Sequence, residues 1–220
     1  MVEDVPFSAN LKTRVIIFAG PVGSGKTTLL NYCLQSRPSE ERWAVLVNDC
    51  GKTEVAKFAE THVEVRTVFG ACENSVKTGV PMRTAVLQML KPPRPQCFLI
   101  ELSTLGQPVA LQELFRSMMG GIASVHVVAT VPQKMHAELW GASAVYRTQL
   151  EQADVLVVQK GEDCEPESEG ACGDIEQRFT EKHVVFWEYG SGNTSTASSE
   201  QVASAVLLKT SALQERATSA

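Results

Sequence analysis

The sequence predicts a doubly wound α/β fold, with a mostly parallel sheet of about seven strands and helices on both faces. Apolar runs of strand length alternate with segments of helical pattern along the chain, as expected for consecutive βαβ units. Most of these runs are continuously apolar, which is typical of parallel strands that are covered on both faces. Right-handed crossovers between such strands place the helices on both sides of the sheet.

Each expected element follows from a local pattern. The expected strands are Val15–Ala19, Trp43–Val47, Val63–Val68, Cys97–Leu102, Ser124–Thr130, Ala153–Gln159 and His183–Trp187. The expected helices are Thr27–Gln35, Pro81–Leu90, Pro108–Met119, Ala142–Gln152, about Cys172–Glu181, and Glu200–Arg216. Pro81 suits a first helical turn and Gly120 suits a helix end, because proline has a fixed helical φ and glycine accepts the left-handed conformation.

At 220 residues the chain is long enough for one domain with a substantial core. Residues 1–13 are expected to form an amino-terminal extension and residues 14–190 the main domain. Residues 191–220 are expected to form a polar linker and a carboxyl-terminal helix with a frayed tail, because the linker is rich in Ser, Thr, Gly and Asn.

The charge balance argues against a nucleic-acid partner. Lys and Arg total 20 against 25 Asp and Glu, for a formal charge of -5, whereas nucleic-acid-binding domains carry a basic patch. No apolar run approaches the length of a membrane span, and the amino terminus lacks the apolar region of a signal peptide. We therefore expect no nucleic acid and no membrane as partners, and a cytoplasmic location.

Six cysteines are spread along the chain without a CxxC pair: Cys33, Cys50, Cys72, Cys97, Cys164 and Cys172. Free thiols are expected, because neither metal-binding spacing nor a sign of an oxidising compartment is present. Cys33 and Cys97 fall in apolar segments and are predicted to be small core residues.

The first strand runs into the strongest motif of the sequence. Residues 20–28 read GPVGSGKTT, which matches GxxxxGK[ST] between a strand and a helix and predicts a P-loop NTPase. Glycines let backbone N–H groups close around a phosphate chain, and the following helix presents its positive end to the same phosphates. Lys26 is expected to reach the β- and γ-phosphates, and the Thr27 hydroxyl to bind Mg²⁺. The predicted nucleotide-binding residues here are Gly20, Gly23, Ser24, Gly25, Lys26, Thr27 and Thr28.

Carboxylates follow two other strands. Glu101 ends the fourth strand, and ligands of open α/β sheets bind at the carboxyl ends of strands. Glu101 therefore suits Mg²⁺ coordination or the polarising of water, although an ordinary strand-end carboxylate shows the same pattern. Asp49 follows the second strand in an Asn-Asp-Cys-Gly segment that also fits a plain turn. The predicted catalytic residues are Lys26, Glu101 and Asp49, and the predicted Mg²⁺ ligands are Thr27 and Glu101.

A base-recognition loop is predicted after the sixth strand. The segment Gln159-Lys160-Gly161-Glu162 places a carboxylate two residues after a lysine. In this arrangement the carboxylate of Glu162 can accept hydrogen bonds from N1 and N2 of guanine, while the stem of Lys160 packs under the ring. A plain polar loop is the alternative.

Together these segments resemble the CobW-type G proteins, the CobW/HypB/UreG nucleotide-binding group of P-loop GTPases. The matching motifs are GxxxxGKTTLLN at Gly20–Asn31, VLVNDxG at Val45–Gly51, ExSxxxxP at Glu101–Pro108 and QxxxAD at Gln149–Asp154. The resemblance covers about Arg14 to Gly190 and identifies this part as a CobW-type nucleotide-binding domain. It implies guanine-nucleotide binding and a role in metal insertion or cobalamin assembly, with a client metalloprotein as a further partner.

Several positions depart from the pattern of this family. Its metal-binding GCxCC stretch is Gly70-Ala-Cys-Glu-Asn74 here, with cysteine only at the intervening Cys72. A site of three thiolates is not formed by this segment, so Zn²⁺ or Co²⁺ is not expected. Thr104 replaces the glycine that would meet the γ-phosphate, and Lys52 replaces a glutamate near the phosphates. In the base-recognition loop NKxD is QKGE, which lengthens two side chains by one CH₂ each.

The expected function is Mg²⁺-dependent binding of GTP and GDP with slow GTP hydrolysis. Lys26 and Mg²⁺ would neutralise the developing charge, and Glu101, assisted by Asp49, would order the Mg²⁺ shell or the attacking water. One alternative is a binding module that holds nucleotide without hydrolysing it. A P-loop kinase or ATPase is a second alternative, which the base-recognition loop and the absence of an arginine-rich lid segment disfavour. The sequence predicts no oligomeric state.

Overall fold

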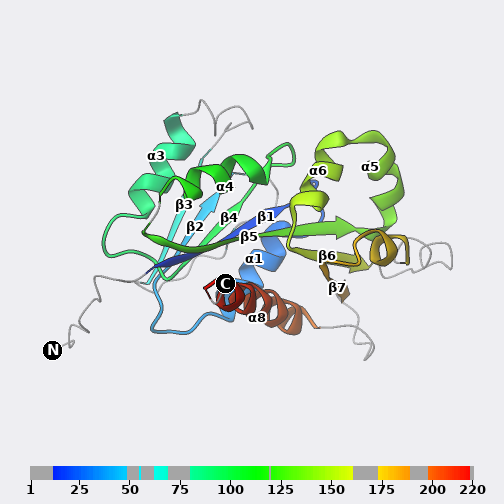
Figure 1. The fold of residues 1–220 in the computed structure, drawn as a ribbon. Coiled ribbons are helices and arrows are strands. Elements are labelled where there is room, and N and C mark those ends of the chain that lie inside the picture. Colours follow the sequence, from blue (N-terminus) through cyan, green and yellow to red (C-terminus); the bar gives the residue numbers. More distant parts are fainter. Residues whose placement is uncertain are drawn as a thin grey trace.

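A parallel sheet of seven strands forms the centre of the described structure (Figure 1). The structure is a computed structural model that describes residues 12–48, 55, 62–68, 80–118, 120–160, 173–188 and 198–218. Neighbouring strands follow the order β3-β2-β4-β1-β5-β6-β7, and each pair is parallel. The strands are β1 (Thr13–Ala19), β2 (Trp43–Val47), β3 (Val63–Thr67), β4 (Cys97–Glu101), β5 (Ile122–Pro132), β6 (Val155–Lys160) and β7 (His183–Glu188).

Helices cover both faces of this sheet. α3, α4 and α6 lie on one face, and α1 and α8 lie on the other (Figure 1). The doubly wound α/β prediction is therefore confirmed, with a sheet that is entirely parallel in the described residues. The helices are α1 (Lys26–Gln35), α3 (Val80–Met89), α4 (Pro108–Arg116), α5 (His136–Ala142), α6 (Ala144–Gln152) and α8 (Ser199–Thr218), with a 3₁₀ helix η1 (Gln133–Met135) and a further helical segment at 173–178.

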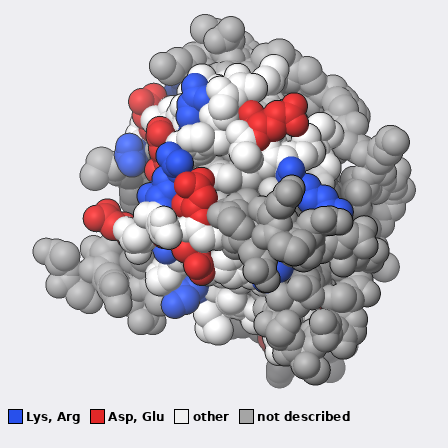
Figure 2. All heavy atoms as spheres, turned by 90° about the vertical axis from the view of Figure 1, so that its right-hand side faces the viewer, with Lys and Arg blue, Asp and Glu red and all other residues white. Residues whose placement is uncertain are grey.

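The end of the molecule that carries α5, α6 and the β7 edge has a surface of mixed charge. Figure 2 shows Lys and Arg interspersed with Asp and Glu on this side. Arg178 and Asp174, for example, form an ion pair at 3.0 Å, and the Arg178 guanidinium lies 4.6 Å from the ring centroid of Trp140. The described part of this surface is thus neither uniformly basic nor uniformly acidic.

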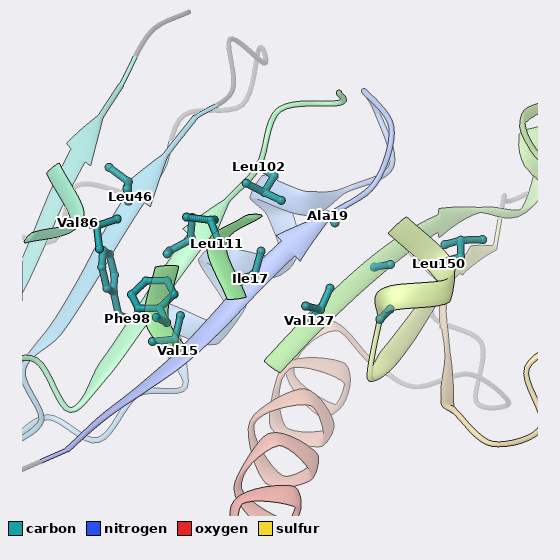
Figure 3. Packing of buried hydrophobic residues seen from close by; sticks show 14 of the residues in the cluster. Val15, Ile17, Ala19, Leu46, Val86, Phe98, Leu102, Leu111, Val127 and Leu150 are labelled. Carbon is teal, nitrogen blue, oxygen red and sulfur yellow. The ribbon is translucent and has the colours of Figure 1, made fainter. Parts of the chain in front are cut away.

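The apolar strands are buried on both faces, as their continuous patterns predict. Val15, Ile17 and Ala19 of β1 face the side of α3 and α4, while Ile16 and Phe18 face the side of α1. Figure 3 shows the first of these two cores, in which residues of α3, α4 and α6 pack on the sheet. Full burial of each large apolar side chain stabilises the folded state by about 1.5–3 kcal/mol, so these two cores hold the layers together.

β5 is the longest strand, and it joins two halves of the sheet at different heights. Its first part pairs with β1, ending with Ala19 opposite Ala129. Its last part pairs with β6, beginning with Val128 opposite Val155. As a result β6 and β7 extend further toward the carboxyl edge of the sheet than β1 does.

The predicted strands are confirmed, with ends that lie within two residues of the expected bounds. The main difference is between β5 and α6, where η1 and α5 were not predicted. The expected single helix from Ala142 to Gln152 is wrong at its start, because Ser143 is extended (φ -117°, ψ 107°) and caps α6 by accepting a hydrogen bond from the Tyr146 N–H. Serine favours this capping position over a helix interior, which explains the break.

Two helices end earlier than their patterns suggest. α4 ends at Arg116 instead of Met119, because the Met118 N–H bonds the Phe115 carbonyl in a tighter turn. The helix expected at about Cys172–Glu181 spans 173–178 in the described residues.

Cys33 and Cys97 are fully buried free thiols, as predicted. Burial raises the pKa of Cys33, and it raises that of Cys97 to about 11, so both remain protonated near neutral pH. Within the described residues no helix has the length and apolar character that a membrane crossing requires. The division of the chain at residues 13 and 190 stays a prediction.

Candidate nucleotide-binding site

The segment between β1 and α1 has a backbone that can close around a phosphate chain. Gly20 and Gly25 adopt φ values of 135° and 86°, which L side chains rarely adopt. A Cβ atom at Gly20 would also lie 2.5 Å from Thr130 Oγ1, so close approach to β5 requires glycine there. Gly23, at φ 75°, has no atom within 4 Å of its Cβ position and marks the open side of the loop.

Lys26 lies across this loop at the start of α1. Its Nζ donates hydrogen bonds to the carbonyl oxygens of Gly20 (3.2 Å) and Pro21 (3.0 Å), and the residue is buried. An ammonium group held in a buried position interacts more strongly with an anion than one in water does. Phosphate oxygens can replace the two carbonyl acceptors without moving the charge away from the loop.

The buried hydroxyl groups of Ser24 and Thr130 form a pair that supports the loop. Ser24 Oγ donates to the Pro21 carbonyl (2.7 Å) and lies 2.5 Å from Thr130 Oγ1, where either hydroxyl can be the donor. Thr130 Oγ1 also bonds the Ala19 carbonyl at 3.2 Å. Thr130 therefore links the end of β5 to the end of β1 and to the loop. No motif in the sequence pointed to it.

Thr27 and Glu101 come together at the phosphate end of the site. Glu101 is the last residue of β4 and lies in register with Phe18 of β1 and Val47 of β2. It is fully buried, and the Thr27 hydroxyl donates to its Oε1 at 2.6 Å. A hydroxyl and a carboxylate are hard oxygen donors of the kind that Mg²⁺ takes from proteins, so this pair fits the metal.

The structure also places Thr28, a predicted nucleotide-binding residue, and Asn48, which precedes the predicted Asp49. Thr28 lies in the first turn of α1 and is half-buried. Asn48 follows β2, is buried, and its N–H donates to the Glu101 carbonyl at 2.9 Å. Asp49, the third predicted catalytic residue, lies outside the described residues, as does Lys52.

Two residues of the predicted base-recognition loop end β6. Gln159 Oε1 lies 3.8 Å from the position that a Cβ atom at Gly25 would occupy, so its amide reaches the phosphate-binding loop. The Nζ of Lys160 lies 5.1 Å from the ring centroid of Phe186 on β7, within the range of a cation–π contact. Glu162, the predicted guanine acceptor, lies outside the described residues.

Gln149 anchors the segment that follows β4. Its Nε2 donates to the carbonyl oxygens of Thr104 (3.1 Å) and Gly106 (2.7 Å), and the side chain is buried. Thr104 occupies the position where a glycine is expected near the γ-phosphate. The QxxxAD motif marked Gln149, but nothing in the sequence showed which backbone it holds.

In the described residues no three His, Cys, Asp or Glu side chains gather as a metal site would require. Cys50, Cys72 and the segment Gly70–Asn74 lie outside this part of the chain.

Comparison with known proteins identifies similar sequences. The model of the family "CobW/HypB/UreG, nucleotide-binding domain" matches residues 14–186. The zinc chaperone YeiR of Escherichia coli is 31% identical over 165 residues, which cover 72% of this chain and 50% of YeiR. The chain thus spans about half the length of this curated relative.

Solved structures show the same fold at lower identity. The Zn(II)-bound YjiA GTPase from E. coli superposes with a TM-score of 0.58 at 17% identity, covering 86% of this chain and 62% of YjiA. The hydrogenase maturation factor HypB from Archaeoglobus fulgidus superposes with a TM-score of 0.53 at 14% identity, covering 90% of each chain.

Proposed function

Because the chain belongs to the CobW/HypB/UreG nucleotide-binding domain family, we propose that it binds GTP with Mg²⁺ and hydrolyses it slowly. The observation that carries this proposal is the 2.6 Å hydrogen bond from Thr27 to Glu101, beside the buried Lys26. These three side chains put an ammonium group and two hard oxygen ligands at the carboxyl edge of the sheet, where α/β proteins bind their ligands.

In this proposal the residues of the chain act mainly by positioning and by charge. The backbone of the loop between β1 and α1 holds the phosphates, and Lys26 exchanges its bonds to Gly20 and Pro21 for phosphate oxygens. Bound Mg²⁺ supplies positive charge that favours the transfer of the γ-phosphoryl group. Glu101 would orient either the oxygen ligands of the metal or the attacking water, and Asp49 is proposed to assist it.

Guanine is the proposed base. Gln159 keeps the amide of the family's asparagine and reaches Gly25 of the loop, while Lys160 keeps the lysine. Glu162 keeps the carboxylate that accepts hydrogen bonds from the guanine edge. GTP and GDP are therefore the proposed ligands, with ATP as the competitor to exclude.

The test is a panel of GTP, GDP and ATP with and without Mg²⁺, read as the thermal midpoint of unfolding. A ligand at one hundred times its Kd adds about 2.7 kcal/mol to the stability of the folded state, which such a scan resolves. Guanine nucleotides should stabilise the protein and Lys26→Ala should abolish the effect. A larger shift with ATP would overturn the guanine assignment and favour a kinase or ATPase.

Single-turnover assays with GTP and Mg²⁺ decide between an enzyme and a binding module. Slow phosphate release that Lys26→Ala abolishes is the expected result. Binding of GTP without release above that of Lys26→Ala would identify a module that holds nucleotide without hydrolysing it.

Zinc handling is a second candidate function, because the relative YeiR is a zinc chaperone. The sequence-based expectation that Zn²⁺ does not bind gains no support from this similarity. Cys50 and Cys72 follow strands that end at the nucleotide edge in sequence, and they are the thiols to test. Competition with a chromophoric chelator should show Zn²⁺ retention that Cys50→Ser and Cys72→Ser both weaken. Zn²⁺ retention equal to that of the wild-type protein in both variants would remove these thiols from the proposal.

A further inference from the structure

We propose that Trp187 is a positioning residue that holds the phosphate-binding loop in its ligand-ready shape and couples that loop to α8. This inference rests on the proposed nucleotide site and adds a residue to it that no motif marks. It concerns the backbone of Gly25, the N-cap of α1.

The indole ring of Trp187 lies directly against Gly25. A Cβ atom at Gly25 would lie 2.8 Å from Cζ3 and 3.3 Å from Cη2 of this ring. Trp187 is in register with Gln159 on the neighbouring parallel strand, so both side chains project from the same face of the sheet. The ring is fully buried within the core formed with α1 and α8, so it has little freedom to move away.

This contact restricts the backbone conformation of Gly25, which no side-chain cap holds. Gly25 has a left-handed backbone (φ 86°), and no side chain caps the start of α1. Glycine can leave such a conformation more easily than other residues, because it lacks a Cβ atom. A rigid ring packed where the Cβ would be removes some of the alternatives. The first N–H groups of α1 then keep the direction that a phosphate group requires.

The position of the ring is set from α8. The Trp187 Nε1–H donates to Ser199 Oγ at 3.2 Å, and Ser199 is the first residue of α8. A reciprocal cap fixes this helix start, because the Gln201 N–H donates to Ser198 Oγ (3.3 Å) and the Ser198 N–H donates to Gln201 Oε1 (2.8 Å). A chain of contacts therefore runs from the start of α8 through one side chain to the loop.

A matched pair of variants separates positioning from general core stability. Trp43 is also fully buried in the same core, and its Nε1–H also bonds a side chain, Glu41, but it lies at the start of β2. Trp187→Phe and Trp43→Phe thus remove the same atoms from one core. In the nucleotide-free protein, Trp187→Phe should speed amide hydrogen exchange of residues 20–28 by about tenfold relative to Trp43→Phe. Equal exchange in the two variants would overturn the inference without touching the proposed function.

Nucleotide affinity gives the second readout. Trp187→Phe should raise the Kd for GDP with Mg²⁺ by about tenfold, because the loop must be ordered on binding, whereas Trp43→Phe should leave it within about twofold. Ser199→Ala keeps the ring and removes its acceptor, so a smaller rise is expected. If the wild-type protein binds no nucleotide, the proposed function fails, while the exchange experiment still decides the role of Trp187.

Fluorescence tests the contact directly. In the double variant Trp43→Phe, Trp140→Phe, the remaining Trp187 should change its emission when GDP and Mg²⁺ are added. The double variant Trp140→Phe, Trp187→Phe, which retains Trp43, should show no change and is the control. An unchanged Trp187 emission at saturating nucleotide would show that the ring does not lie against the occupied loop, and would overturn the inference even if Trp187→Phe does not fold.

Discussion

The hydroxyl of Thr27 donates to the carboxylate of Glu101 across 2.6 Å, although the two residues are 74 positions apart in the chain. Thr27 lies in the first turn of α1 and Glu101 ends β4, and the two meet because β4 lies beside β1 in the sheet. The pair thus depends on the order of the strands. It supplies both of the metal ligands that we propose from the described residues.

Glu101→Gln should weaken the dependence of nucleotide binding on Mg²⁺. The amide keeps the size of the side chain but loses the charge that favours a divalent cation, so the Mg²⁺ concentration for half-maximal effect should rise by about 10- to 100-fold. Titration of Mg²⁺ at fixed GDP, read by thermal shift, measures this. Glu113→Gln on the exposed side of α4 removes the same charge and should leave the titration unchanged. An identical curve for Glu101→Gln would place the metal elsewhere.

Thr130→Val should destabilise the protein and loosen the loop. Valine keeps the shape but leaves Ser24 Oγ without its 2.5 Å partner in a buried position. A cost of about 1–3 kcal/mol in the free energy of unfolding is expected, measured by urea denaturation. Thr148→Val, at a partly exposed position of α6, is the control and should change stability by less than about 0.5 kcal/mol. A similar loss in both variants would count against the hydroxyl network.

Gln149→Leu should alter GTP hydrolysis more than GDP binding. It removes the donor to the carbonyl oxygens of Thr104 and Gly106, which follow Glu101. Gln152 of the same helix is a matched control, because its Oε1 accepts from the Val109 N–H at 3.1 Å and holds the start of α4 instead. Both leucine variants should cost about 1–3 kcal/mol in stability. Only Gln149→Leu should change the single-turnover rate; equal rates would show that this anchor is purely structural.

Stability should decrease as the pH falls through 6.5. Burial is the main cause that lowers the pKa of His136 and of His126 below 6.5; for His136, Asp174 opposes this shift and Arg178 adds to it. Between the lowered pKa and 6.5 the unfolded chain binds more protons than the folded one. The free energy of unfolding therefore decreases as the pH is lowered through this range. Urea denaturation at about pH 7.5 and about pH 5.5 measures this slope.

Variants of histidine give the control for this pH dependence. His136→Asn should flatten the slope, because the buried imidazole no longer has to take up a proton. His183→Asn, at an exposed position, should keep the wild-type slope. A wild-type slope in His136→Asn would contradict the assignment to His136.

The fold was predictable because its signals are local. The length and composition of each apolar run, such as Trp43–Val47, indicate a strand that is covered on both faces. The η1 and α5 segments were missed for the opposite reason. They are short, and the break at Ser143 depends on a single capping side chain that a helical pattern across Ala142 concealed.

The candidate site was predictable only in part. The loop around Lys26 is contiguous in sequence, and Glu101 is marked by its place after a strand. Thr130 and Trp187 carry no such mark, because their roles arise from contacts with Gly20 and Gly25 across the sheet. Spacing along the chain does not contain that information, and only the packed structure supplies it.

The carboxyl ends of β1 and β6 lie at different levels of the sheet, and this step shapes the candidate site. Gln159 lies three positions beyond Leu156, which is level with Ala129 and so with Ala19, the last residue of β1. At the rise of a parallel strand this offset is about 10 Å. The pairing of β5 with its two neighbours therefore sets the backbone of Gln159 beyond the end of β1, at the level where its amide reaches Gly25 of the loop that follows β1. The same step places the start of the proposed base-recognition segment beside the proposed phosphate-binding loop, where one bound nucleotide would contact both.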